Sequence, residues 1–173
     1  MSTEPATEPD LTAAPERRLA RAGFTLTREY PVPVARLWDA FAHEDQKRAW
    51  LGTDENFDAR EWVFDFRVGG VDVVEANFHH GPVSRFVSTY TDIVEQTRIV
   101  TTYDMWLGGV HMSTSVASFE FEATPGSDGQ PGSLLTHVEH GVFFDQFWAD
   151  GAGREEGTRG IHEKLGRFLT AAP

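Results

Sequence analysis

Residues 150–169, DGAGREEGTRGIHEKLGRFL, decide how the rest of the chain is arranged. Large apolar residues recur in this stretch at i, i+4, i+7 and i+8, which is the spacing of one face of an amphipathic helix. They are Ile161, Leu165, Phe168 and Leu169. Asp150 stands where an N-cap residue is expected. The sequence therefore predicts a C-terminal helix that buries one face against a sheet.

The same face carries glycines when it is followed toward the N-terminus. Gly160, Gly157 and Gly153 stand where large side chains are expected, and each costs a helix interior about 1 kcal/mol relative to alanine. Either a strand presses closely against the helix backbone there, or space lies beneath the first half of the helix. Both explanations require a sheet that curves around the helix.

The chain of 173 residues is long enough for one domain with a sizeable core. Residues 1–21 are rich in Thr, Ala, Pro and Glu and contain few large apolar groups, so we expect a flexible acidic and proline-rich tail. Within it, PERRLARA from Pro15 is expected to form a short helical turn. Residues 22–173 are then expected to form a single domain.

Composition excludes several classes of partner and site. The net charge of −12 would repel a phosphate backbone, so we expect no nucleic-acid partner. The absence of cysteine excludes disulfides, thiolate metal sites and a cysteine nucleophile. No apolar run approaches the roughly 20 residues of a membrane span, and no signal-peptide pattern opens the chain, so we expect a cytoplasmic protein without membrane insertion.

Two short helices are predicted directly after the first strand. Residues 24–30 alternate as a strand, and the prolines that follow end it. Val34, Leu37, Trp38 and Phe41 recur at helical spacing, and a second short helix over about residues 44–51 stops at Gly52. Helices placed between the first strand and all the others would close one open end of a curved sheet.

From residue 61 onward, turn residues separate further strands. A strand over residues 62–68 is expected to meet the next through a two-residue turn at Gly69-Gly70. The remaining strands are expected over residues 71–78, 83–94, 99–107, 111–123 and 133–140. The fold class is therefore α+β, with about seven antiparallel strands in a meander and the long C-terminal helix across one face.

Several stretches between residues 24 and 169 resemble the family named for the activator of the 90-kDa heat-shock protein ATPase. They are YPVPVARLWDAF, FDFRVGGV, YTDIVEQTRIVTTYDM, STSVASFEF, LLTHVEHG and REEGTRGIHEKLGRFL. The order of elements also resembles the helix-grip fold of the START/SRPBCC superfamily, which includes Bet v 1-like and polyketide cyclase-like proteins. The resemblance implies a curved antiparallel sheet that grips the last helix around an internal cavity. It implies no single chemistry, because members bind lipids, steroids or polyketides, some cyclise them, and one branch assists a chaperone.

Strand alternation supplies candidates for the wall of that cavity. In STSVASFEF one face carries Ser113, Ser115, Ala117, Phe119 and Phe121, and the two aromatic residues indicate that this face is the inner one. Its other members are small. Small side chains opposite the glycine half of the helix would leave space in a core that otherwise packs closely.

His137 and Glu139 share a face of the last strand, which the resemblance implies is the inner one. A histidine and a carboxylate two residues apart could orient a polar ligand group or exchange a proton with it. They could equally satisfy one another or lie at the wet rim of the sheet. We favour a ligand contact over catalysis. Tyr90, Tyr103 and Met105 are further candidates, because a tyrosine hydroxyl is a suitable anchor in an apolar pocket.

Aromatic residues crowd the link between the last strand and the helix, at Phe143, Phe144, Phe147 and Trp148. They could gate the cavity, form a dimer contact or, as we favour, cap the core. The complete set of candidate cavity-lining residues is Tyr90, Tyr103, Met105, Ser113, Ser115, Ala117, Phe119, His137, Glu139, Phe143, Trp148, Gly157 and Ile161.

No pattern in the chain predicts a metal site, a cofactor or a catalytic residue. His137 and His140 are three apart on a strand, so their side chains leave opposite faces, and His79-His80 stands beside no carboxylate. Neither an HExxH helix nor a G-x-S-x-G turn occurs.

These observations favour a binding domain with an internal cavity for a small apolar or amphipathic molecule. One alternative is a cyclase or hydratase that uses a cavity histidine, glutamate or tyrosine as acid or base. The other is a protein-interaction or co-chaperone-like module, with a homodimer formed through exposed sheet or aromatic loops. A cavity flanked by Gly157, Ser115 and His137 would support the first two hypotheses, and a filled interior would support the third.

Overall fold

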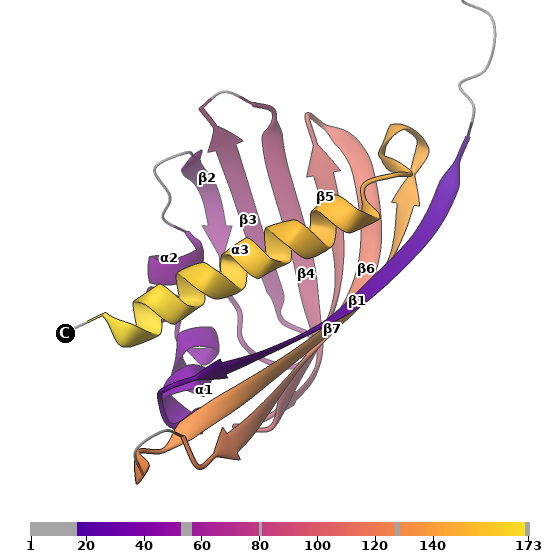
Figure 1. The fold of residues 1–173 in the computed structure, drawn as a ribbon. Helices are drawn as coiled ribbons and strands as arrows, with labels where there is room; N and C mark the ends of the chain where they lie inside the picture. The colour runs from indigo at the N-terminus through magenta and orange to yellow at the C-terminus, as the bar shows by residue number, and fades with distance from the viewer. Residues whose placement is uncertain (1–16, 53–56, 80, 127–128, 172–173) are drawn as a thin grey trace, which may run out of the picture.

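The computed structural model describes residues 17–52, 57–79, 81–126 and 129–171. In these residues a seven-stranded antiparallel sheet curves around the long helix α3 (Gly151–Thr170), which crosses one face of the sheet diagonally (Figure 1). The strand order is β1-β7-β6-β5-β4-β3-β2, so the chain forms a meander and its first strand pairs with its last. The strands are β1 (Leu19–Tyr30), β2 (Phe57–Val63), β3 (Val71–Phe78), β4 (Val83–Val94), β5 (Arg98–Leu107), β6 (Val110–Thr124) and β7 (Gly132–Phe144). This arrangement confirms the predicted helix-grip fold.

Helices α1 (Val34–Ala42) and α2 (Glu44–Leu51) follow β1, as predicted, and lie together beside the C-terminal half of α3 (Figure 1). The apolar face of α1 is buried, and the ring of Trp38 packs edge-on against Phe121 of β6, with 5.2 Å between centroids. The indole nitrogen of Trp50 donates a hydrogen bond of 2.7 Å to the carbonyl of Ala40. The two helices therefore form one apolar unit that completes the core at this end of the sheet.

Strand β1 begins at Leu19, earlier than the boundary that composition predicted. Leu19 pairs with Phe144, and the register then continues without a break to Tyr30. The predicted short helical turn is therefore wrong for residues 19–22, because the long strand β7 offers them backbone partners that outweigh a weak local preference for a turn. Of the tail predicted over residues 1–21, residues 19–21 belong to β1, and residues 1–16 lie outside the described residues.

The predicted two-residue turn at Gly69-Gly70 is also wrong. β2 ends at Val63, and residues 64–70 form a loop that returns across β4. Gly69 donates its backbone N–H to Tyr90 at 2.8 Å, and Tyr90 donates its own to Gly70 at 3.0 Å. A side chain at Gly70 would collide with the carbonyl of Asp65, so the loop needs a glycine there. The conformation of this loop therefore depends on contacts with β4, which the local sequence does not encode.

Strand β7 is longer than predicted and includes Phe143 and Phe144, which were assigned to the link. Phe143 is fully buried between β1 and β6, where it pairs with Ala20 and Ser113. Phe143 is therefore a core residue, as we favoured, but it belongs to the sheet and not to the link. The link itself is the short 3-10 helix η2 (Asp145–Phe147).

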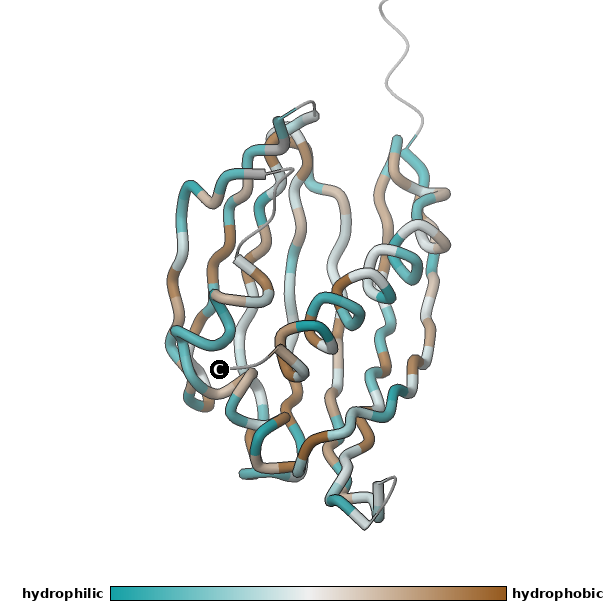
Figure 2. Tube along the Cα trace, turned by 60° about the vertical axis from the view of Figure 1, so that its left-hand side comes forward, coloured by the Kyte–Doolittle hydropathy of each residue, from teal (hydrophilic) through white to brown (hydrophobic). Residues whose placement is uncertain are grey.

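Helix α3 is confirmed, but its buried face is rotated from the predicted one. The buried side chains recur at i, i+4, i+7 and i+11, and they are Thr158, His162, Leu165 and Leu169. Ile161 and Phe168 are only partly buried. Figure 2 shows the resulting alternation of hydrophilic and hydrophobic segments along the helix. Asp150 occupies the N-cap position, as predicted, but its side chain makes no capping hydrogen bond.

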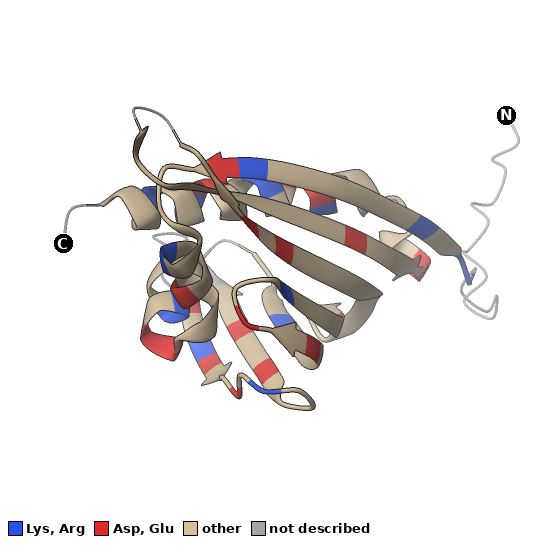
Figure 3. Cartoon of the chain, turned by 90° about the horizontal axis from the view of Figure 1, so that it is seen from below, with Lys and Arg blue, Asp and Glu red and all other residues tan. Residues whose placement is uncertain are grey.

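Charged residues of both signs are interspersed on the strands and helices of the described chain (Figure 3). Acidic residues outnumber basic ones in the chain, which gives the net charge of −12. No helix in the described ranges is both long and apolar enough to cross a membrane.

Candidate functional site

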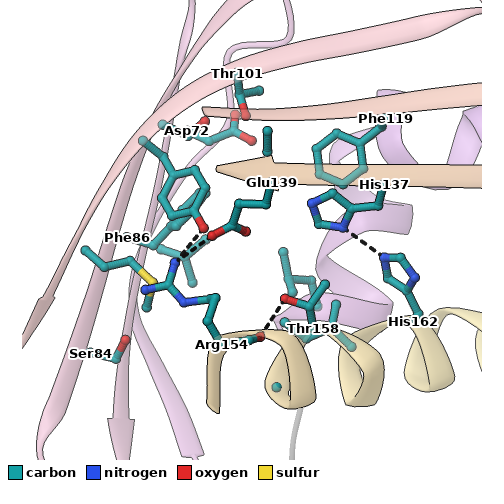
Figure 4. Close-up of a pocket in the computed structure, with 18 of the residues that line it drawn as sticks. Asp72, Ser84, Phe86, Thr101, Phe119, His137, Glu139, Arg154, Thr158 and His162 are labelled. Carbon is teal, nitrogen blue, oxygen red and sulfur yellow. Dashed lines mark hydrogen bonds and ion pairs between the residues drawn. The ribbon is translucent and has the colours of Figure 1, made fainter. Parts of the chain in front are cut away.

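A pocket of about 660 Å³ lies between the curved sheet and the first half of α3 (Figure 4). This volume is within the range that small-molecule sites occupy. Most of the wall is apolar, and its larger members are Phe41, Trp50, Leu51, Val74, Phe86, Ile99, Met105, Met112, Phe119 and Ile161. Polar side chains enter this wall as a few separate groups, which the following paragraphs describe.

Two glycines of α3 border the pocket without close neighbours. A Cβ atom added to Gly153 or Gly157 would meet no heavy atom within 4 Å, and both residues line the pocket. Opposite them, Ala117 of β6 lines the pocket with a small side chain. Of the two explanations for the glycines, a closely pressed strand is therefore excluded at these positions, where both residues are exposed and border the pocket.

The structure brings most of the predicted cavity residues to this pocket. Those that line it are Tyr90, Tyr103, Met105, Ala117, Phe119, His137, Glu139, Gly157 and Ile161. Ser113, Ser115 and Phe143 face the same side but are buried outside the lining, with exposed fractions of 0, 4 and 1 %. The prediction that these three residues line the pocket is therefore wrong.

Trp148 lies still farther from the pocket, on the surface. Its side chain is 47 % exposed, and the guanidinium of Arg18 lies over the indole ring at 5.3 Å. Neighbouring residues of a 3-10 turn point about 120° apart, and the preceding Phe147 takes the buried direction. The prediction that Trp148 lines the cavity is therefore wrong.

One polar group is centred on Arg154, in the first turns of α3. Its guanidinium donates hydrogen bonds to the Tyr103 hydroxyl at 2.5 Å and to the Ser113 hydroxyl at 2.8 Å. It also forms an ion pair of 3.2 Å with Glu139 and lies over the rings of Tyr103 and Phe143. Burial raises the pKa of Tyr103, so its hydroxyl stays protonated. Arg154 thus holds together three strands of the sheet beneath the helix.

A second polar group joins α2 to the sheet. The Lys47 ammonium forms an ion pair with Asp72 of β3 and donates a hydrogen bond of 3.0 Å to the Tyr90 hydroxyl. The same hydroxyl donates to Asp72 at 2.5 Å. Burial and the neighbouring carboxylate of Asp72 raise the pKa of Tyr90. The other carboxylate oxygen of Asp72, Oδ1, is buried and has no hydrogen-bond partner.

The third polar group is a pair of histidines between β7 and α3. Nδ1 of His137 lies 3.1 Å from Nε2 of His162, and the two side chains are 6 and 4 % exposed. Burial, reinforced by the adjacent His162, lowers the pKa of His137 to about 3. Burial, with Arg28 and Arg159 nearby, lowers the pKa of His162 to about 4. Both imidazoles are therefore neutral at physiological pH.

Sequence reasoning missed the partners that complete these groups. Arg154, Thr158 and His162 recur every four residues along α3, so they share one helix face. These three polar residues continue the helix face that carries the buried Leu165. Their position on that face was a signal that could have identified them as inward-facing. Lys47 and Asp72 carry no such signal, because each is one charged residue in an amphipathic segment.

The described residues hold no group of three His, Asp or Glu side chains that could bind a metal ion. The prediction that His79 stands beside no carboxylate is wrong, because Nε2 of His79 lies 3.2 Å from Asp58 Oδ2. Asp58 comes from the paired strand β2, which explains why sequence proximity did not reveal it. His80 lies outside the described residues.

The comparisons with known proteins agree with this architecture. The family model described as "Activator of Hsp90 ATPase homolog 1-like protein" matches residues 31–169. The crystal structure of the Mll3558 protein from Rhizobium loti has 38 % sequence identity and a TM-score of 0.76, with 87 % of this chain and 99 % of that chain covered. An uncharacterized protein from Rhizobium leguminosarum has 30 % identity and a TM-score of 0.77, with 88 and 97 % covered.

A more distant structure shares the fold alone. It is the solution structure of an AHSA1-like protein from Aeromonas hydrophila, with 18 % identity, a TM-score of 0.58 and coverage of 84 % of this chain and 92 % of that chain. No curated protein matches the chain significantly. The comparisons therefore identify a family and a fold, and the pocket chemistry has to be argued from this chain's own residues.

Proposed function

Because the chain belongs to the family of Activator of Hsp90 ATPase homolog 1-like proteins, we propose a function suited to that fold, the binding of a small apolar or amphipathic molecule beneath α3. The observation that carries the proposal is the pocket of about 660 Å³ between sheet and helix. Ligand sites in proteins are typically concave, mostly apolar and supplied with a few polar groups that orient the ligand. The pocket has each of these properties.

The glycines of α3 support the same proposal, because they lower the stability of the helix. Gly153 and Gly157 weaken the helix by about 1 kcal/mol each relative to alanine, and no closely packed neighbour requires their small size. Both glycines are exposed at the edge of the pocket, where the lack of a side chain leaves room for a ligand beside the helix backbone.

The alternative of a cyclase or hydratase has less support. A general base works best when its pKa lies near the operating pH, whereas burial lowers the pKa of His137 to about 3. The carboxylate of Glu139 is held in an ion pair with Arg154. The pocket histidine and glutamate are thus better suited to holding a ligand than to transferring protons. An interaction module or homodimer remains the other alternative, and it would leave the pocket without a role.

Native mass spectrometry of protein purified without added ligand tests the proposal. We expect a co-purifying small molecule, or saturable uptake of the uncharged fluorescent probe N-phenylnaphthylamine with one site per chain. Bound probe should lose fluorescence when an apolar competitor is added. Neither a co-purifying molecule nor saturable uptake, in a protein shown to be folded by circular dichroism, would contradict the proposal and favour the interaction alternative.

A further inference from the structure

The geometry of the pocket points to a chemical class of ligand, and this inference rests on the proposed function. We propose that the ligand is an uncharged molecule whose apolar body carries a hydroxyl or carbonyl group, and that this group forms a hydrogen bond with Nε2 of His137. Three observations support this assignment, namely a buried nitrogen without a partner, a ring held in a fixed position and the balance of charges in the wall.

The first observation is the state of the His137 ring. Nε2 of His137 is buried and has no hydrogen-bond partner among the described residues, while Nδ1 of the same ring lies 3.1 Å from Nε2 of His162. The side chain is 94 % buried, as its exposed fraction is 6 %, and it lines the pocket. A buried polar atom without a partner costs about 1–3 kcal/mol, and such atoms are uncommon in native proteins. A ligand atom in the pocket would supply the missing partner.

The second observation is that the ring cannot turn away from the pocket freely. Phe119 lies against the His137 ring with 4.2 Å between centroids, and Phe24 meets it edge-on at 5.5 Å. Figure 4 shows His137 reaching from its strand toward α3 beside Phe119, with the other ring nitrogen turned away from His162. Contacts from both sides therefore fix the direction of the unpartnered nitrogen before any ligand arrives.

The third observation is that the buried charges of the wall are already balanced. Arg154 is paired with Glu139 and Lys47 with Asp72, and the two histidines are neutral. The other charged residues of the wall, Asp150 and Lys164, are partly exposed. A carboxylate or amine brought into this interior would be a buried charge without a counter-charge, which costs several kcal/mol. An uncharged group avoids this cost.

Asp72 Oδ1 is the other buried polar atom of the lining that has no partner. A carboxylate oxygen accepts hydrogen bonds only, so a hydroxyl could donate to it and a carbonyl could not. Neutral His137 can donate or accept at Nε2, depending on the tautomer that His162 selects. A ligand with more than one hydroxyl would thus satisfy both positions.

Three probes with one shared skeleton test the inference, namely biphenyl, para-hydroxybiphenyl and para-biphenylcarboxylate. Titration calorimetry at pH 7 should find hydroxybiphenyl bound about fivefold more tightly than biphenyl, because a net hydrogen bond contributes roughly 1 kcal/mol. The carboxylate should bind most weakly. In the variant His137→Phe the advantage of the hydroxyl over the hydrocarbon should disappear. The matched control His140→Phe changes an exposed histidine of the same strand and should keep that advantage.

The outcomes separate this inference from the proposed function. If hydroxybiphenyl and biphenyl bind with equal affinity, or if the carboxylate binds best, the ligand class is wrong although the pocket binds ligands. If no probe binds, the proposed function itself fails. Nitrogen NMR of the wild-type protein decides the matter even if His137→Phe does not fold. The Nε2 signal of His137 should move when hydroxybiphenyl is added and stay in place with biphenyl, and the reverse pattern would overturn the inference.

Discussion

Nδ1 of His137 on β7 lies 3.1 Å from Nε2 of His162 on α3, so a single contact between two neutral imidazoles joins the sheet to the helix at the pocket wall. One ring donates its N–H and the other accepts, and burial keeps both uncharged. The pair therefore links the stability of the helix–sheet interface to pH. It also decides whether Nε2 of His137 donates or accepts a hydrogen bond. The first prediction follows from this link.

The histidine pair should make the protein less stable as the pH falls below about 6.5. In the folded state the pKa of His137 is lowered from 6.5 to about 3 and that of His162 to about 4. Between pH 6.5 and these lowered pKa values, the unfolded chain binds protons that the native protein does not bind. The free energy of unfolding should thus fall with pH by up to about 1.4 kcal/mol per histidine and pH unit. Above pH 6.5 both states are neutral, and the pair adds no pH dependence.

Urea denaturation at several values between pH 7 and pH 5 measures this effect. Acidic residues also titrate toward the lower end of this range, so the comparison is with the double variant His137→Phe/His162→Leu. That variant should lose less stability over the interval than the wild type. Parallel pH profiles for the two proteins would show that the pair is not held neutral in the native state.

Leu165 should be one of the residues on which the helix–sheet interface depends most. Its side chain is fully buried in the core cluster, together with residues of α1, β6 and β7. Leu165→Ala removes apolar contacts and leaves a void, which should lower the free energy of unfolding by roughly 2–5 kcal/mol. The exposed Glu163 offers a control, since Glu163→Ala should change stability by less than about 0.5 kcal/mol. A similar small loss for Leu165→Ala would mean that the helix does not bury this face.

Gly157 should tolerate a larger side chain at the expense of ligand space. Gly157→Ala should be neutral or stabilising by up to about 1 kcal/mol, because a Cβ meets nothing within 4 Å and alanine favours the helix. Gly157→Leu should keep the fold and weaken the binding of N-phenylnaphthylamine, as measured by fluorescence titration. Gly160→Leu is the matched control, since Gly160 also faces open space but does not line the pocket. Destabilisation by Gly157→Ala with unchanged probe binding would contradict the pocket at this position.

Deletion of the N-terminal segment should have different effects at two lengths. The composition of residues 1–15 predicts that their removal leaves the melting temperature unchanged. Removal of residues 1–21 should lower it, because Leu19, Ala20 and Arg21 pair with the end of β7. Thermal denaturation followed by circular dichroism distinguishes the two shortened proteins. A clear drop with the shorter deletion would show that residues 1–15 contribute to the folded domain.

Periodicity alone determined the elements that repeat a local pattern. The apolar spacing in α1 and α3 and the alternation along β6 follow from helix and strand geometry, so their existence and approximate faces could be read from the residues. Of the glycines of α3 and the small residues of β6 that predicted a cavity, Gly153, Gly157 and Ala117 line the pocket, whereas Gly160, Ser113 and Ser115 do not. The loop over residues 64–70 and the start of β1 could not be read in this way, because backbone partners on β4 and β7 fix them.

Only the tertiary structure decided which polar groups meet in the pocket. Arg154 reaches Tyr103, Ser113 and Glu139 from the first turns of α3, and Lys47 reaches Asp72 from α2. Each of these pairs joins two elements whose separation in the sequence carries no periodic signal. A local pattern shows that a polar side chain faces inward, but its partner, its charge state and its unpartnered atoms depend on how whole elements pack. The sequence therefore determined a helix laid over a curved sheet with space between them, and the packing determined the chemistry of that space.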